Sequence, residues 1–266
     1  VEDFYGPAGM VSFATTKGYL NGFHFSLFHI FQENLFNTYL IYFITLISLF
    51  LVTIGLFSRT ALFLALLGIV SLHMRNIWIL SSADVLIRCV FMILVWSPCF
   101  NVLSLDSFIA AKRGKPLPVQ ASQWTWRLMQ IQICVVYLWT FWSKIKGDAW
   151  FDGSAVYYAT RLETLKHYTL PWILDNKHSL MLLTWSSLLI ELSLGILVWF
   201  KKTRKPVIVA GIIFHLGIEY VMAIPFFEWI MIVLLLNFFE PEEYLSLLMK
   251  LKEKIKTTIA DLEIKE

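Results

Sequence analysis

Long apolar runs separated by short polar stretches make up most of the chain from about residue 38 onward. A run of about 20 apolar residues is the length at which a helix crosses the hydrocarbon core of a bilayer. Seven apolar segments stand out, at residues 38–57, 60–73, 85–97, 124–142, 180–200, 206–223 and 226–239. The second, third and seventh are shorter than a straight span needs, so we expect them to be tilted, thinly spanning or partly re-entrant.

Composition points in the same direction. Of the 266 residues, 58% are hydrophobic and 16% are aromatic, and a water-soluble core cannot hide that much apolar surface. The sequence therefore predicts an all-α fold, a polytopic transmembrane helical bundle over residues 38–239. The formal net charge of +3 is small and dispersed, so we expect no nucleic-acid partner.

The segments that flank the bundle predict two different locations. Residues 1–37 combine aromatic side chains with Gly, Pro and His, which favours a segment lying at the outer membrane interface. Residues 240–266 repeat apolar positions among lysines and glutamates, which predicts an amphipathic helix on the cytoplasmic side. Because Val1 is not a natural start, we expect a longer protein with one more helix, giving eight spans.

Basic residues set the predicted orientation, because cytoplasmic loops carry an excess of lysine and arginine. One set of loops and the tail are rich in these residues, whereas the other set is poorer and diluted by acidic residues. The residues assigned to the cytoplasmic side are Arg59, Lys112, Arg113, Lys115, Lys201, Lys202, Arg204, Lys205, Lys250, Lys252, Lys254, Lys256 and Lys265. The loop at residues 143–179 then lies outside.

A partly polar stripe runs along the fourth apolar segment. Its members follow the spacing that places side chains on one helix face; they are Gln130, Cys134, Tyr137, Phe141 and Lys144. At the end of this stripe the Lys144 ammonium loses hydration, which favours the neutral amine and makes it available as a base. The alternative is that Lys144 only extends its charge to the membrane surface.

Ionisable residues in the other apolar segments are costly at membrane depth and are therefore informative. Asp84 and Arg88 stand four residues apart and can form an ion pair on one helix face, which is most simply structural. Glu191, His215 and Glu219 are expected to face the bundle interior. Such a set serves as a proton relay, a helix clasp or a metal site, and we expect no metal because no fourth ligand is suitably spaced.

Two further expectations concern isolated residues. Glu228 follows an aromatic pair close to a segment end, so we expect it to be solvated at the outer surface. Cys89, Cys99 and Cys134 have no C-x-x-C spacing, which predicts free thiols.

The order of several motifs resembles the HTTM domain, the membrane domain that vitamin K-dependent gamma-glutamyl carboxylase shares with bacterial relatives. The motifs are H-M-R-N at 73–76, S-S-A-D-V-L-I-R at 81–88, S-L-D at 104–106, W-R-L-M-Q-I-Q-I at 126–133, S-K-I-K-G-D-A-W-F-D-G-S-A-V-Y-Y at 143–158 and F-H-L-G-I at 214–218. The resemblance extends over nearly the whole chain from about residue 38. It implies an integral protein of the bacterial cytoplasmic membrane, and the distribution of basic residues predicts a cytoplasmic C-terminus.

In the carboxylase, a membrane-embedded base deprotonates a hydroquinone that then reacts with O2, and the product drives carboxylation of a peptide glutamate. The resemblance implies that Lys144 is the catalytic lysine, although Lys146 stays an alternative, and that His215 is a second catalytic residue. The residues implied to contact a reduced quinone of the vitamin K or menaquinone type are Asn76, Tyr137 and Gln130. The animal enzyme has a histidine directly after the asparagine that corresponds to Asn76, whereas this chain has Ile77. This difference argues against carboxylation itself as the reaction of this chain.

Two functions follow from this resemblance. The first is a carboxylase-like enzyme that oxidises a membrane hydroquinone to modify or mature an exported peptide, with a separate subunit to dock that peptide. The second is a non-catalytic scaffold, or a subunit that binds lipid or quinone and supports peptide toxin maturation. Substitution of Lys144 separates the two.

Overall fold

A computed structural model of the chain describes residues 1–19, 25–118, 123–240 and 243. The described residues form helices and 3-10 turns but no strand, apart from one isolated bridge between Lys166 and Met222. This confirms the all-α prediction. The predicted amphipathic helix at 240–266 lies outside the described residues, except for residues 240 and 243.

The chain divides into two compact units, one over residues 1–129 and one from residue 130 onward. The helices of the first unit are α1 (Glu2–Tyr5), α2 (Phe13–Tyr19), α3 (Leu35–Ile54), α4 (Ser58–Arg75), α5 (Ser82–Val95) and α6 (Leu105–Lys112), with 3-10 turns η1 (Leu27–His29), η2 (Ile77–Ile79) and η3 (Cys99–Asn101). The helix α7 (Gln123–Lys144) begins in the first unit and continues into the second.

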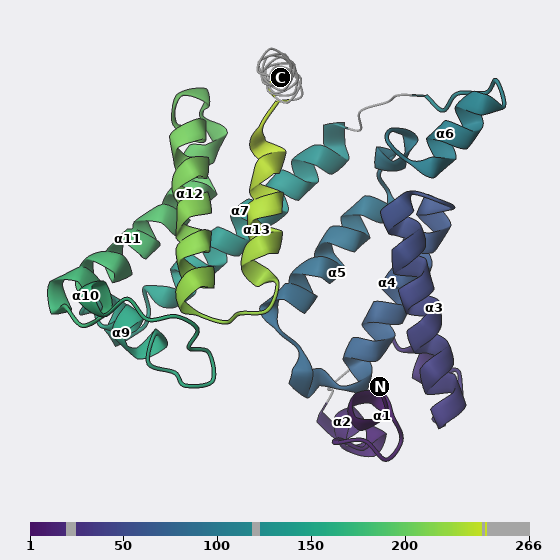
Figure 1. The fold of residues 1–266 in the computed structure, drawn as a ribbon, viewed down its shortest axis with the longest axis horizontal. Coiled ribbons are helices and arrows are strands. Elements are labelled where there is room, and N and C mark those ends of the chain that lie inside the picture. Colours follow the sequence, from purple (N-terminus) through teal and green to yellow (C-terminus); the bar gives the residue numbers. More distant parts are fainter. Residues whose placement is uncertain (20–24, 119–122, 241–242, 244–266) are drawn as a thin grey trace, which may run out of the picture. The chain divides into compact units, whose positions relative to one another are not determined.

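The described part of the second unit continues with short helices followed by longer ones (Figure 1). They are α8 (Asp148–Phe151), α9 (Ala155–Ala159), α10 (Pro171–Leu174), α11 (Lys177–Ile196), α12 (Lys201–Val221) and α13 (Phe227–Leu235), with 3-10 turns η4 (Leu197–Trp199) and η5 (Leu236–Phe238). Within this unit α12 packs against both α11 and α13.

Each of the seven predicted apolar segments lies on a helix, in order α3, α4, α5, α7, α11, α12 and α13. In the described chain, two helical stretches are long and apolar enough to cross a membrane, Leu35–Ile54 and Lys177–Trp199. The bundle of about seven spans, and its cytoplasmic C-terminus, stay predictions.

The polarity of α3 and α11 is inverted relative to a helix of a water-soluble core. The buried residues of α3 are Thr38, Ile41, Thr45 and Ser48, whereas its exposed side chains include those of Phe36, Phe43, Ile47 and Phe50. The helix α11 exposes Leu182, Trp185 and Leu189, and its buried residues, half of them polar, are Leu180, Thr184, Ser187, Glu191, Leu194 and Gly195. Small polar residues at helix contacts and large apolar residues outside are typical of helices in lipid.

A close approach joins α3 and α4, which lie side by side in the first unit (Figure 1). Gly68 of α4 faces Thr45 of α3, and a β-carbon at position 68 would collide with the Thr45 hydroxyl. The Thr45 hydroxyl donates to the carbonyl of Ile41 at 2.7 Å, so it is satisfied within its own helix. The missing side chain at Gly68 is therefore what allows the two backbones to approach.

The N-terminal segment is held by the C-terminal end of α4. Arg75, which is fully buried, donates to the carbonyls of Gly6 at 2.5 Å and Val11 at 2.9 Å. Its Nε also lies 3.2 Å from Glu33 Oε1. Burial raises the pKa of Glu33, and the charge of Arg75 opposes this rise. The segment is thus folded against α4, while its place at a membrane interface stays a prediction.

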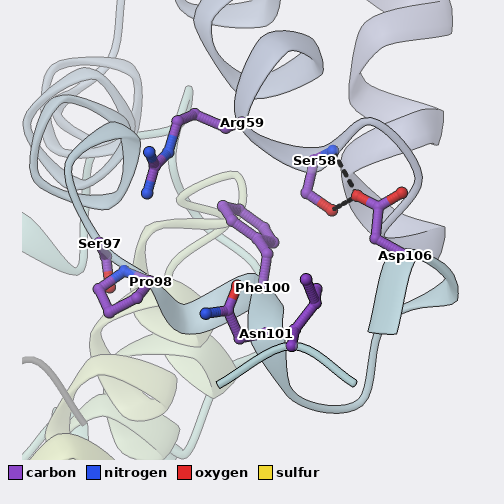
Figure 2. A pocket seen from close by; sticks show the side chains of 8 residues that line it. Ser58, Arg59, Ser97, Pro98, Phe100, Asn101 and Asp106 are labelled. Carbon is purple, nitrogen blue, oxygen red and sulfur yellow. Dashed lines mark hydrogen bonds between the residues drawn. The ribbon is translucent and has the colours of Figure 1, made fainter. Parts of the chain in front are cut away.

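The S-L-D motif supports the start of α4. Asp106 accepts hydrogen bonds from the amides of Phe57 and Ser58, at 3.0 and 2.9 Å, and from the Ser58 hydroxyl at 2.9 Å. Figure 2 shows this contact at the edge of a cavity of about 360 Å³, into which Arg59 and Asn101 also project. Both oxygens of Asp106 are used by α4, so the motif is structural.

Candidate functional site

An ion pair lies at the end of α7. The Lys144 Nζ is 2.5 Å from Oε1 of Glu191 on α11. The Glu191 side chain is only 6% exposed, whereas that of Lys144 is 26% exposed. The second carboxylate oxygen, Oε2, is buried and has no hydrogen-bond partner among the described residues. The pair therefore combines a partly accessible cation with a buried anion that has one unused acceptor.

The turn after α7 places an aromatic ring against this pair. The amide of Gly147 donates to the carbonyl of Lys144 at 2.9 Å, and the amide of Trp150 donates to the carbonyl of Gly147 at 3.0 Å. These bonds fold the chain back, so that Lys144 Nζ lies 4.6 Å from the centroid of the Trp150 ring. A cation at this distance is attracted by the ring face.

The two candidate lysines have different surroundings. Lys146 is exposed, and its Nζ lies 4.8 Å from the centroid of the Trp142 ring. Among the ion pairs of the described residues, Lys144 is joined to a buried carboxylate and Lys146 is not. This geometry favours Lys144 over Lys146 as the lysine of the site.

A second polar group lies deeper in the same unit. His215 of α12 contacts Glu228 of α13 through Nδ1 and the Tyr137 hydroxyl of α7 through Nε2, the latter at 2.7 Å. The exposed fractions of the three residues are 2%, 1% and 2% respectively. Because a carboxylate only accepts, Nδ1 carries the proton toward Glu228, and in the neutral ring Nε2 accepts from Tyr137.

The ion pair and this buried group each include one residue of α7. Tyr137 and Lys144 are seven residues apart on α7, which is two helical turns on the same face. Tyr137 contacts His215 of α12, and Lys144 contacts Glu191 of α11. The predicted stripe on α7 thus faces α11 and α12 with its polar side chains.

Two other members of the stripe make structural contacts. The Gln130 amide donates to the carbonyl of Asn237 at 2.8 Å, and Gln130 is 2% exposed. The Cys134 thiol lies 3.7 Å from the carbonyl of Leu194. Cys89 and Cys134 are free thiols as predicted, and the side chain of Cys99 lies outside the described residues.

Asn76 lies in the first unit, and its bonds are made there. Its amide donates to the carbonyl of Phe4 at 2.9 Å, and its side-chain oxygen accepts from the amide of Trp78 at 3.2 Å. With an exposed fraction of 1%, Asn76 joins the N-terminal segment to the end of α4. Its contact with a quinone stays a prediction.

The predicted pairing of Asp84 with Arg88 is wrong, since no such ion pair occurs among the described residues. Asp84 instead accepts from the amide and hydroxyl of Ser81, at 2.7 and 2.8 Å, and lies 3.6 Å from Nε2 of His73. A carboxylate at the third helical position turns back to cap the first turn. The S-x-x-D spacing that begins at Ser81 is the sequence pattern from which this helix cap could be predicted.

The expectation for Glu228 was also wrong, because this residue is buried rather than solvated. The chain turns at Phe226, which has a positive φ of 60°, and α13 then begins with Glu228 in its first turn. Glu228 thereby replaces Glu219 as the partner of His215, whereas Glu219 accepts from the Trp229 indole at 2.9 Å. The described residues contain no cluster that could hold a metal ion.

Comparison with known proteins identifies the wider family. The family model of the HTTM domain matches residues 4–242, which is most of the chain. No curated protein matches the chain, and no solved structure matches it.

Proposed function

The chain belongs to the HTTM domain family, and on that premise we propose that it is a carboxylase-like membrane enzyme that oxidises a hydroquinone with O2. The family is membrane-associated and related to the vitamin K-dependent carboxylase. The product of the oxidation would drive modification or maturation of an exported peptide, which a separate subunit would present. The hydroquinone would be of the vitamin K or menaquinone type.

The observation that carries this proposal is the contact between Lys144 and Glu191. Such a pair can remove a proton from a hydroxyl group and keep the resulting charge away from bulk water. Because the Lys144 side chain is partly exposed, a substrate hydroxyl can approach the pair from the end of α7. Polar residues buried in an apolar bundle are expensive, so their presence favours a functional role.

The residues around the pair fit an aromatic diol. The unpartnered Oε2 of Glu191 can accept from a hydroxyl, and the Trp150 ring beside Lys144 offers an apolar face. The hydroquinone would lose its two hydroxyl hydrogens and gain one oxygen atom across a ring C=C bond, and this four-electron oxidation would reduce O2 to give the quinone epoxide and water. The protein would orient the diol through Glu191 and Lys144, and His215 with Tyr137 would provide a further buried polar group in the same unit.

The test is epoxide formation by the purified protein in nanodiscs with reduced menaquinone and O2. Lys144→Ala should abolish product, whereas Lys146→Ala should retain it, because Lys146 lacks the buried carboxylate partner. Equal activity in both variants would contradict the assignment of Lys144. No epoxide from the unaltered protein, with reduced quinone supplied, would contradict the enzymatic proposal.

One set of observations favours the alternative, a non-catalytic scaffold that binds lipid or quinone. Asn76, Asp84 and Gln130 each have structural partners within their own unit. A scaffold would keep its cellular role in peptide or toxin maturation after Lys144→Ala, provided the variant folds. Loss of that role with folding retained would exclude the scaffold.

A further inference from the structure

The arrangement of Lys144 and Glu191 restricts which atom can receive a proton. A lysine that is ion-paired with a carboxylate is an ammonium, which has three donors and no lone pair. It therefore cannot take another proton while the pair is formed. The carboxylate can, because Oε1 is occupied by Lys144 whereas Oε2 forms no hydrogen bond with the part of the chain that the structure describes.

We propose that Glu191, through Oε2, is the proton acceptor of the site and that Lys144 is the cation that stabilises the oxyanion formed. This inference rests on the proposed function, since it takes the hydroquinone as the proton donor. The donor's O–H bond breaks, its electron pair stays on the donor oxygen, and a new O–H bond forms on Glu191. No electron is transferred in this step, and no other reactant is needed.

The charge balance favours this division of roles. Before the step the Lys144 ammonium faces the Glu191 carboxylate, and after it the same ammonium faces the donor's oxyanion. One positive and one negative charge are present throughout, so the step creates no new charge in a region where an unpaired charge is costly. Had Lys144 been the acceptor, the pair would first have to exchange its own proton.

Among the described residues of this unit, the buried carboxylate of Glu228 is less suited to the task. Glu228 is 1% exposed and is held by the ring of His215. Glu191 is paired with the partly exposed Lys144, which lies over the Trp150 ring, and a lipid-soluble diol can approach the pair from the side of Lys144. Glu191 is therefore the carboxylate that accepts the proton, and Glu228 is the carboxylate that holds the His215 ring.

The experiment is an anaerobic titration of the nanodisc-embedded protein with menadiol, followed by the ultraviolet band of the bound naphtholate. Arginine keeps its positive charge at any working pH, so Lys144→Arg should retain the band. Glu191→Gln should lose it, and its rate of epoxide formation in O2 should fall about 10²–10⁴-fold, the usual contribution of a general base. Glu191→Asp keeps an acceptor and should retain a weaker band.

The opposite pattern would overturn the inference. If Lys144→Arg lost the band while Glu191→Gln kept it, the neutral lysine would be the acceptor. Absence of the band in the unaltered protein would also overturn it. A band without epoxide after O2 is admitted would leave the inference standing and would refute the proposed oxidation instead.

Two controls accompany this experiment. Binding of radiolabelled menadiol to each variant shows whether a lost band reflects lost binding. Glu191→Asp, which keeps the acceptor, is the control for misfolding of Glu191→Gln.

Discussion

The Tyr137 hydroxyl lies 2.7 Å from Nε2 of His215, although the two residues are 78 positions apart in the chain. Glu228 contacts the other nitrogen of the same ring. Three helices, α7, α12 and α13, therefore meet at one buried imidazole. Both ring nitrogens of His215 have a partner, which makes the contact stabilising and its partial removal costly.

Removal of the Glu228 carboxylate should destabilise the second unit strongly. Glu228→Leu leaves the His215 ring without its acceptor, and breaking a buried pair on one side costs about 3–5 kcal/mol. Glu228→Gln retains an acceptor and should cost less, about 1–3 kcal/mol. Thermal unfolding in nanodiscs measures both, with Glu219→Gln as the control at a partly exposed carboxylate. An unchanged midpoint for Glu228→Leu would contradict the contact.

The pair of Lys144 and Glu191 should show energetic coupling that Lys146 lacks. Lys144→Met strands a buried carboxylate, so it should lower the unfolding midpoint, and adding Glu191→Leu should recover part of the loss. A double-mutant cycle should give a coupling of about 0.5–3 kcal/mol. Lys146→Met should change the free energy of unfolding by no more than about 0.5 kcal/mol. A coupling of zero would mean that the pair does not form in the membrane.

The helices could be predicted from the sequence because their signal is local. Each apolar segment is long enough to indicate a helix by itself, and all seven lie on helices. The polar positions on α7 were also predictable, because helical spacing alone places Tyr137 and Lys144 on one face. What spacing could not provide was the choice of partners among three helices.

Glu228 illustrates this limit. Its position near a segment end suggested solvation, but the left-handed conformation at Phe226 redirects the chain into α13. Asp84 illustrates another limit, because two local interactions competed for it. A bond to the Ser81 amide within the same turn forms in place of an ion pair with Arg88, and four-residue spacing does not distinguish the two outcomes.

A side chain at Gly68 should loosen the contact between α3 and α4. Gly68→Leu would drive its β-carbon into Thr45, and overpacking of this kind costs about 1–3 kcal/mol. Gly217→Ala is the matched control, since a β-carbon there meets no atom within 4 Å, and its midpoint should stay the same or rise slightly. Equal midpoints for Gly68→Leu and the unaltered protein would show that α3 and α4 are further apart.

The support that Asp106 gives to α4 should depend on pH. Burial raises the pKa of Asp106, but hydrogen bonds from Ser58 and Phe57 outweigh this effect and hold the pKa below its ordinary value of 3.8. The carboxylate therefore stabilises the fold above the unfolded pKa, and this contribution is lost as the pH falls through the lower folded pKa.

The corresponding measurement compares Asp106→Ala with the unaltered protein between neutral and strongly acidic pH. At neutral pH the variant should be less stable by about 0.5–2 kcal/mol, the usual value of a helix cap. The difference should shrink as the pH approaches and passes below 3.8. A difference that is constant over this range would show that the charge of Asp106 does not matter.

The exposed apolar face of α3 should be intolerant of charge only near the middle of the helix. Ile47 is 58% exposed, so on a water-facing surface Ile47→Arg would be nearly neutral. In lipid, arginine at a helix centre costs about 2.5–3.5 kcal/mol, whereas near a helix end it reaches the membrane surface cheaply. Thr53→Arg, one residue before the end of α3, is therefore the control. The measurement is the unfolding midpoint and the membrane-inserted fraction of each variant. A lower midpoint and inserted fraction for Ile47→Arg, with Thr53→Arg unchanged, would place this face in the hydrocarbon. Equal midpoints and inserted fractions for the two variants would exclude that placement.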